Sequence, residues 1–262
     1  MLTGVNGNSL HSNLLHADSS IAKSLERISS GKSITRASDN PAGSAMLSAF
    51  DSQTRALTQL MSNQQSQASL LQTASSSLST TSSILQGINS LTLQASNGTL
   101  TDSDRAMIQQ QINQLSTQIN MSANQAQFNG QNLLDGSFST TLQNGQQFAI
   151  DAMTASALGV NNLSVATQGD AMSASELAKS ALSKVVSTQS SIGSVINGIN
   201  SSLANLGTQY LNAVSSQSQI GDVDMANEIM NMTLSKMQSQ ASIKVFKMNE
   251  ESRSTALKLL GE

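Results

Sequence analysis

Apolar residues recur along most of this chain at intervals of three and four, the spacing that places side chains on one face of an α-helix. The first stripe consists of Leu10, Leu14, Ala17, Ile21, Leu25 and Ile28, and it stops at Ser29-Ser30-Gly31. Asn40-Pro41 predicts the start of a second helix, because Asn is a favourable N-cap and Pro is tolerated at the first helical position. No strong breaker follows before Asn97-Gly98, so this helix is expected to contain about 55 residues and to extend roughly 80 Å.

Two further helices are predicted by residue pairs that have the spacing of a capping box. Thr101 and Asp104 are expected to begin a third helix, and Ser173 and Glu176 a fourth. The third helix has the apolar stripe Ile108, Ile112, Leu115, Ile119 and Ala126. The fourth has a near-heptad seam made of Leu177, Ala181, Val185, Thr188, Ile192, Val195, Ile199, Ser202 and Leu206.

Glycines interrupt the fourth helix at Gly193, Gly198 and Gly207. Each costs about 1 kcal/mol relative to Ala in a helix, so the pattern indicates close approach of a neighbouring helix or gentle bends at these positions. A last amphipathic segment is expected at residues 223–260, after Gly221-Asp222.

The helical spacing stops between residues 128 and 165. Asn129-Gly130 and Asp135-Gly136 favour tight turns, because these residues tolerate positive φ. Alternating apolar residues predict a hairpin of residues 138–142 and 146–151 around Asn144-Gly145, and a further short strand at 161–165. The pattern therefore predicts a mainly α fold, an elongated antiparallel helical bundle or coiled coil, with a small β-hairpin region at the far end and the two chain ends together.

The two end segments each have one apolar stripe and no local partner except the other. An isolated amphipathic helix is marginal in water, so both segments are expected to pair with each other or with further copies of the chain. We therefore expect residues 1–40 and 222–262 to form paired terminal helices. Residues 41–221 are expected to form a helical rod that carries the β region 128–165.

Composition argues against a compact enzyme. Aromatic residues make up 2% of the chain, Trp and Cys are absent, and 12 Met help to supply the apolar faces. Small side chains pack helices closely but build a thick core poorly. The net charge is −3 and the 13 basic residues are scattered, which predicts no nucleic-acid partner. No apolar run predicts membrane insertion, and the N-terminal residues lack the features of a cleavable signal peptide.

No catalytic, cofactor-binding or metal-binding residues are predicted. Gly31-Lys32-Ser33 resembles the end of a phosphate-binding loop, but Glu26 stands where that motif requires an earlier glycine. His11 and His16 are the only histidines, and five residues apart on a helix they point in different directions. The carboxylates are mostly at helix starts, where they complement the helix dipole.

Four sequence blocks resemble the bacterial flagellins. Glu26-Arg-Ile-Ser-Ser-Gly-Lys-Ser-Ile-Thr-Arg-Ala-Ser-Asp-Asn-Pro-Ala-Gly43 is similar to the flagellin segment between the N-terminal helix and the long helix that follows it. The other three blocks, in the order of the family, are Phe128-Asn-Gly-Gln-Asn-Leu-Leu-Asp-Gly136, Met153-Thr-Ala-Ser-Ala-Leu-Gly159 and Ser218-Gln-Ile-Gly-Asp-Val-Asp-Met-Ala-Asn-Glu228. The chain resembles a short, core-only flagellin that lacks large outer domains.

The resemblance implies a structural subunit that polymerises into the bacterial flagellar filament for motility. It implies export without a cleavable signal peptide, an extracellular location, and as partners other copies of the chain, the flagellar cap, the junction proteins and an export chaperone. The terminal helices would line the inner tube of the filament. We assign self-assembly to their large apolar residues, namely Leu10, Leu14, Ile21, Leu25, Ile28, Ile229, Met232, Met237, Ile243 and Phe246.

Two other interpretations remain. The flagellar hook–filament junction protein shares similar end helices, although its middle usually departs from the blocks at residues 128–136 and 153–159. A soluble coiled-coil adaptor, which would form a small closed oligomer, is the alternative from a different class.

The resemblance also predicts weak detection by a vertebrate host. The toll-like receptor for flagellin reads a Leu-Gln-Arg-x-Arg-Glu-Leu run on the second helix and a Glu on the third. The equivalents of its arginines and acids here are Gly87, Asn89, Ser90 and Gln111, and Leu91 ends the run. Neither Gly nor Asn replaces the planar fork of Arg.

We expect this chain to activate the receptor poorly. Loss of a central interface anchor typically costs about 2 kcal/mol, so two or three losses amount to roughly a thousandfold. A reporter-cell assay on the monomer measures the effect, and potency equal to that of a flagellin with the full run would contradict it.

Overall fold

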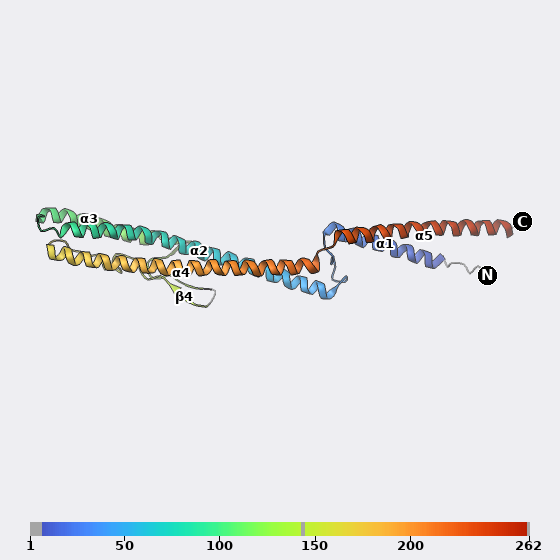
Figure 1. Cartoon of the computed structure of the whole chain (residues 1–262), viewed down its shortest axis with the longest axis horizontal. Helices are drawn as coiled ribbons and strands as arrows, with labels where there is room; N and C mark the ends of the chain where they lie inside the picture. Colours follow the sequence, from blue (N-terminus) through green and yellow to red (C-terminus); the bar gives the residue numbers. More distant parts are fainter. Residues whose placement is uncertain (1–6, 143–144, 261–262) are drawn as a thin grey trace. The chain divides into compact units, whose positions relative to one another are not determined.

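The computed structural model describes residues 7–142 and 145–260, and this part of the chain forms five helices and four short strands (Figure 1). The helices are α1 (Gly7–Ser30), α2 (Pro41–Ala95), α3 (Asp102–Gln125), α4 (Gln168–Gly221) and α5 (Met225–Leu260). The strands are β1 (Gln127–Phe128), β2 (Gln131–Asn132), β3 (Ser139–Thr141) and β4 (Gln147–Ala149). The prediction of a mainly α fold with a small β-hairpin region is confirmed.

The chain divides into two compact units. The end unit contains the described residues up to Thr58 and from Thr208 onward, and the middle unit contains residues 59–207. The helices α2 and α4 therefore contribute residues to both units.

The predicted end of the first helix and the predicted starts of the second and third helices are confirmed. Gly31 has φ +69°, and its N–H donates to the Arg27 carbonyl at 2.9 Å, which is the left-handed ending typical of helices. The Asn40 side chain accepts from the Gly43 N–H at 2.9 Å and caps α2. Thr101 and Asp104 form the reciprocal capping box at the start of α3.

The predicted start of the fourth helix is wrong. The helix α4 begins at Gln168, because the capping box lies at Thr167 and Asp170: each side chain accepts from the backbone N–H of the other residue, at 3.1 and 3.2 Å. Ser173 lies inside the helix and donates to the Gly169 carbonyl. Leu177 of the predicted seam is exposed, since Ala171, Ala174 and Ala178 extend the buried face instead.

The tight turn predicted at Asn129-Gly130 and the hairpin predicted for residues 138–142 and 146–151 are confirmed. The strands β1 and β2 pair around Asn129 and Gly130, whose φ values of 51° and 78° match the turn that favours Asn-Gly. In the second hairpin Thr140 of β3 pairs with Phe148 of β4, and Gly145 has φ +81°. Asn144 lies outside the described residues.

The predicted strand at residues 161–165 is wrong, because side chains of α3 bind this segment instead of a neighbouring strand. The Gln109 amide donates to the Leu163 carbonyl at 2.7 Å and accepts from the Val165 N–H at 2.9 Å. Ser116 donates to the Val160 carbonyl, and Asn120 accepts from the Ala155 N–H. These contacts satisfy backbone groups that a strand would have paired in a sheet.

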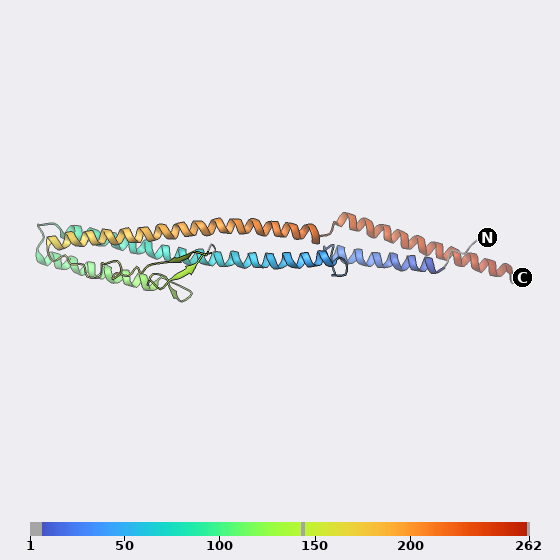
Figure 2. The same cartoon turned by 90° about the horizontal axis from the view of Figure 1, so that it is seen from below.

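The core of the middle unit lies between α2, α3, α4 and the irregular segment 126–165 (Figures 1 and 2). Its largest fully buried side chains are Leu71, Leu78, Leu85, Ile88, Ile112, Ile119, Leu133, Leu134, Ile150, Val160, Val165 and Ile192. Most of the predicted stripes on α3 and α4 face this core. A Cβ at Gly193, Gly198 or Gly207 would meet nothing within 4 Å, so of the two alternatives predicted at these glycines the close helix approach is wrong, and gentle bends stay a prediction.

A buried arginine fastens the turn between α2 and α3. Arg105 is 7% exposed, and its guanidinium donates to the carbonyls of Ala95, Asn97 and Leu100 at 3.2, 3.0 and 3.0 Å. The end of a helix leaves carbonyl groups without partners, and the planar fork of Arg supplies several donors to them at once.

We expect Arg105→Lys to lower the free energy of unfolding by about 2 kcal/mol, because one ammonium does not reproduce the fork and leaves buried carbonyls unpaired. Urea unfolding followed by circular dichroism measures the loss. The control is Arg55→Lys: Arg55 forms an ion pair with Asp51 and its side chain is 80% exposed, so the change should stay within about 0.5 kcal/mol. Equal losses in the two variants would contradict the role of Arg105.

Candidate self-assembly surface

The helices α1 and α5 pair with each other in the end unit. The residues buried between them are small or polar, and include Ala17, Ser24, Glu228 and Ser239. Ser24 donates to Glu228 Oε1 at 2.6 Å within this buried seam, and Ser239 donates to Asp18 Oδ1 at 3.3 Å. Arg27 lies 3.8 Å from Glu228 Oε2. The side chains that the end helices bury most fully are thus small or polar, and several of them bond across the pair.

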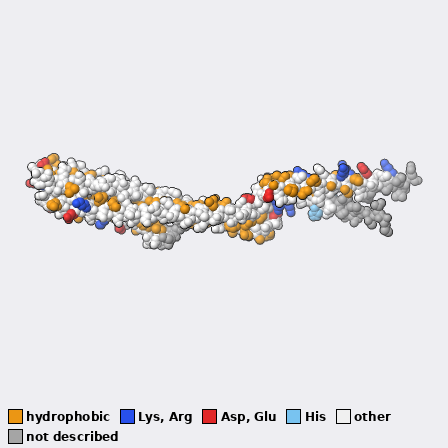
Figure 3. All heavy atoms as spheres, in the orientation of Figure 1, with side chains coloured by type: hydrophobic (Ala, Val, Ile, Leu, Met, Phe, Trp, Pro, Cys, Tyr) orange, Lys and Arg blue, Asp and Glu red, His pale blue; other side chains and the backbone are white. Residues whose placement is uncertain are grey.

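Large apolar side chains remain exposed on α5. They are Met225, Ile229, Met230, Leu234, Met237, Ile243, Val245, Phe246 and Met248. Figure 3 shows hydrophobic side chains gathered over the start of this helix. On α1, Leu15 and Leu25 are exposed in the same way. Because exposed apolar area lowers the free energy of a protein in water when it is buried, this surface favours association.

The predicted self-assembly residues fall into two groups. Leu25, Ile229, Met237, Ile243 and Phe246 are exposed. Leu14, Ile21, Ile28 and Met232 are half-buried, and the side chain of Leu10 lies outside the described residues. The structure adds Met230, Leu234 and Met248, which the sequence pattern could have revealed because they recur at helical spacing with Met237.

The pair leaves an apolar hollow between its helices. The hollow has a volume of about 170 Å³ and is lined by His11, Leu14, Ser242, Ile243, Phe246 and Lys247. The predicted residues Leu14, Ile243 and Phe246 therefore surround space that α1 and α5 do not fill.

The two breaks in the helices of the end unit bind each other. Residues 31–33 and 221–223 form an antiparallel bridge, in which Ser33 N–H donates to the Gly221 carbonyl at 2.8 Å and Val223 N–H to the Gly31 carbonyl at 3.1 Å. Lys32 Nζ lies 2.7 Å from Asp222 Oδ1, and Ser218 donates to Asp222 Oδ2. We call this contact the junction bridge. It fixes where the pair of end helices begins.

The residues equivalent to the receptor-binding run are divided between neighbours in the middle unit. A Cβ at Gly87 would lie 3.5 Å from Leu115 of α3, whereas Asn89 accepts from Ser175 of α4 at 2.9 Å. Leu91 is half-buried, and Ser90 and Gln111 are exposed. Weak receptor activation stays a prediction.

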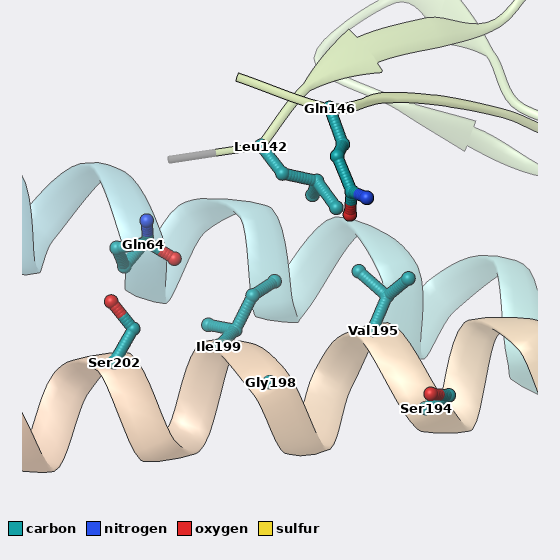
Figure 4. A pocket seen from close by; sticks show the side chains of 8 residues that line it. All are labelled: Gln64, Leu142, Gln146, Ser194, Val195, Gly198, Ile199 and Ser202. Carbon is teal, nitrogen blue, oxygen red and sulfur yellow. The ribbon is translucent and has the colours of Figure 1, made fainter. Parts of the chain in front are cut away.

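A surface cleft of about 300 Å³ in the middle unit lies between α2, α4 and the hairpin of β3 and β4 (Figure 4). Its lining residues are Gln64, Leu142, Gln146, Ser194, Val195, Gly198, Ile199 and Ser202. None of them ionises, so the cleft offers no general acid or base. Across the described residues, no helix has both the length and the apolar character to cross a membrane.

These features define a helical structural protein whose end helices expose apolar surface. Family models of the bacterial flagellin N-terminal helical region and C-terminal helical region match residues 2–139 and 175–260. The chain belongs to the bacterial flagellin family, whose members are structural subunits of the flagellar filament.

Two relatives match over most of their length. A flagellin of Halalkalibacterium halodurans is 32% identical over 248 residues, which cover 91% of this chain and 91% of the relative. The flagellar filament 30.7 kDa core protein of Treponema maltophilum is 30% identical over 245 residues, which cover 84% of this chain and 85% of the relative.

Solved structures agree with the fold. The crystal structure of Bacillus cereus flagellin is similar over 55% of this chain and 88% of that chain, with a TM-score of 0.50 and 25% identity. A putative flagellar hook-associated protein from Vibrio parahaemolyticus is similar over 70% of this chain and 100% of that chain, with a TM-score of 0.60. Its 16% identity shows the fold alone, so the junction-protein alternative is not better supported than the filament subunit.

The junction bridge makes a prediction about pH. The hydrogen bond from Lys32, and then the one from Ser218, hold the pKa of the Asp222 carboxyl below its usual value of 3.8. Because the folded-state pKa is lowered, the contribution of this carboxylate to stability is present above pH 3.8 and is lost as the pH falls through the folded-state pKa.

We expect Lys32→Gln to raise the pKa of Asp222 toward its usual value, as measured by an NMR titration of the side-chain carboxyl carbons. Asp104 is the internal control, because hydrogen bonds from Thr101 lower its pKa and do not involve Lys32. An unchanged midpoint for Asp222 in the variant would show that the bridge does not hold the carboxylate.

Proposed function

We propose that this chain polymerises through α1 and α5 into the bacterial flagellar filament that drives motility. The observation that best supports the proposal is the contrast between the buried seam of this helix pair and its exposed surface. The seam between the helices holds small and polar residues such as Ala17 and Ser24, while large apolar residues such as Ile229 and Phe246 stay exposed. Further copies of the chain are the partner that buries them.

The energetics of the pair support assembly. A helix needs buried apolar area to offset the conformational entropy lost on ordering, and a seam of small polar residues supplies little of it. Ile229 is 46% and Phe246 44% exposed, so each has a large area left to bury between copies. Association then stabilises the same helices that carry it.

The proposed division of the chain follows its helix breaks. Residues 1–40 and 222–262 would be the terminal helices that line the inner tube, and residues 41–221 would form the rod with the β region 128–165. The junction bridge between residues 31–33 and 221–223 supports a boundary there, because it joins the two chain segments where these parts meet. Helices α2 and α4 lie entirely within residues 41–221 and end at these boundaries, α2 at Pro41 and α4 at Gly221.

The proposal includes the setting of the filament. The chain would be exported without a cleavable signal peptide and would assemble outside the cell, with the flagellar cap, junction proteins and an export chaperone as partners. The relatives from Treponema maltophilum and Halalkalibacterium halodurans, a flagellar filament core protein and a flagellin, support the filament itself as the place of assembly.

We expect Ile229→Asp and Phe246→Asp to yield folded monomers that do not polymerise. Each side chain is about half exposed in the monomer, so the free energy of unfolding should fall by only about 1 kcal/mol. A charge buried without a partner between copies costs several kcal/mol. Sedimentation and electron microscopy after salting-out measure polymer, and circular dichroism measures folding.

The matched controls are Ile229→Met and Phe246→Leu, which keep an apolar side chain at the same place. Both should polymerise like the unmodified chain. Normal filaments from the two Asp variants would refute assembly through this surface.

A further inference from the structure

Three exposed methionines lie in one stripe along α5. Met230, Met237 and Met248 are 60%, 53% and 61% exposed. Leu234 and Ala241 lie between them in the chain, and both are exposed as well. At about 100° per residue, these five side chains fall within about 60° of one another around the helix. We call Met230, Met237 and Met248 the methionine stripe.

The stripe lies on the face of α5 that points away from α1. Glu228 and Ser239 mark the face toward α1, because they bond Ser24 and Asp18 of that helix. On the same helical geometry, these two residues lie roughly 160° from the centre of the stripe. The pairing of the end helices therefore leaves the three thioethers open to solvent.

We propose that the methionine stripe is a site of reversible oxidation by hydroperoxides, and that its oxidation blocks assembly. The proposal rests on the function proposed above, because it requires that this face of α5 be buried between copies. Leu or Ile at the same positions would not undergo this oxidation.

The reaction needs only a hydroperoxide as co-reactant. A lone pair on the thioether sulfur attacks the terminal oxygen of the peroxide, the S–O bond forms and the O–O bond breaks. The leaving hydroxide or alkoxide takes up a proton. Sulfur is oxidised to the sulfoxide, and the peroxide is reduced to water or an alcohol. Methionine sulfoxide reductases, one for each epimer, restore the thioether.

The product opposes burial. A sulfoxide is polar and accepts hydrogen bonds, so an apolar interface that buries it without a donor pays the desolvation cost of that group. Three such groups lie in one stripe, so their effects fall on the same contact. Met107, Met121 and Met172 are exposed as well but belong to the middle unit, whereas Met225 of α5 is 42% exposed and lies roughly 150° from the stripe around the helix.

The test compares two triple variants under hydrogen peroxide. One carries Met230→Leu, Met237→Leu and Met248→Leu, which keeps the stripe apolar but removes its sulfur. The matched control carries Met107→Leu, Met121→Leu and Met172→Leu, whose methionines are 57%, 50% and 59% exposed. Mass spectrometry of peptides counts the sulfoxides, and sedimentation measures the monomer concentration left at equilibrium with polymer.

Peroxide should raise that concentration about tenfold or more in the unmodified chain and in the control triple, and should leave it unchanged in the stripe triple. Treatment of the oxidised unmodified chain with both reductases should restore assembly. Equal sensitivity of the two triples would overturn the proposal, and so would normal assembly of a chain oxidised at all three stripe positions.

A second measurement keeps the test decisive if Leu at the stripe itself disturbs assembly. Peroxide is added to monomer and to preformed filament, and the oxidation rate of each methionine is compared. The stripe methionines should oxidise at least about tenfold more slowly in filament than in monomer, because they are buried there. Equal rates in a sample that has polymerised would overturn the proposal while leaving polymer formation intact. Failure of the untreated, unmodified chain to polymerise would instead refute the proposed function.

Discussion

The polar seam between α1 and α5 is the constraint on which the end unit depends. Ser24 and Glu228 bond each other out of contact with water, and Ser239 bonds Asp18. A buried carboxylate without a partner is costly, so these bonds select one register of the two helices. Polar contacts thereby set how the two helices pair, while large apolar residues such as Ile229 and Met230 stay exposed for other contacts.

The middle unit follows the opposite rule. Leu71, Leu78 and Leu85 of α2 are fully buried at intervals of seven residues, and Ile112 and Ile119 of α3 meet them from the facing helix. Most of its Leu and Ile side chains are buried in one core, although Met107, Met121 and Met172 stay exposed. Polar side chains such as Gln109 bind the backbone of the irregular segment. A chain with a low aromatic content thus contains a middle unit with a packed apolar core and an end unit with exposed apolar residues.

Much of the fold could be predicted because its signals are local. The spacing of Ile108, Ile112 and Ile119, and the Thr101–Asp104 box, depend only on nearby residues. The wrong strand at residues 161–165 resulted from non-local hydrogen bonds. The side chain of Gln109 takes the place of a strand partner for residues 163–165, and no residue near that segment in the sequence predicts this. The start of α4 was misplaced for a different reason, since Thr167 and Asp170 have the same spacing as Ser173 and Glu176, and burial of Ala171 and Ala174 decides between them.

The sequence predicted which helix carries the candidate surface, but not which face of that helix is exposed. The apolar content of residues 223–260 identified the helix, whereas the face that stays open depends on where α1 lies, and Glu228 fixes that only in three dimensions. The junction bridge could not be predicted either, because residues 31–33 and 221–223 are far apart in the sequence.

The hydrogen bonds of Arg105 in the α2–α3 turn end on acceptors whose charge does not depend on pH. The guanidinium donates to three neutral backbone carbonyls, which do not titrate. The junction bridge relies instead on a carboxylate, that of Asp222. In an acidifying medium the junction bridge therefore loses the ion pair between Lys32 and Asp222 and keeps its two backbone hydrogen bonds, whereas the three carbonyls bound by Arg105 remain acceptors.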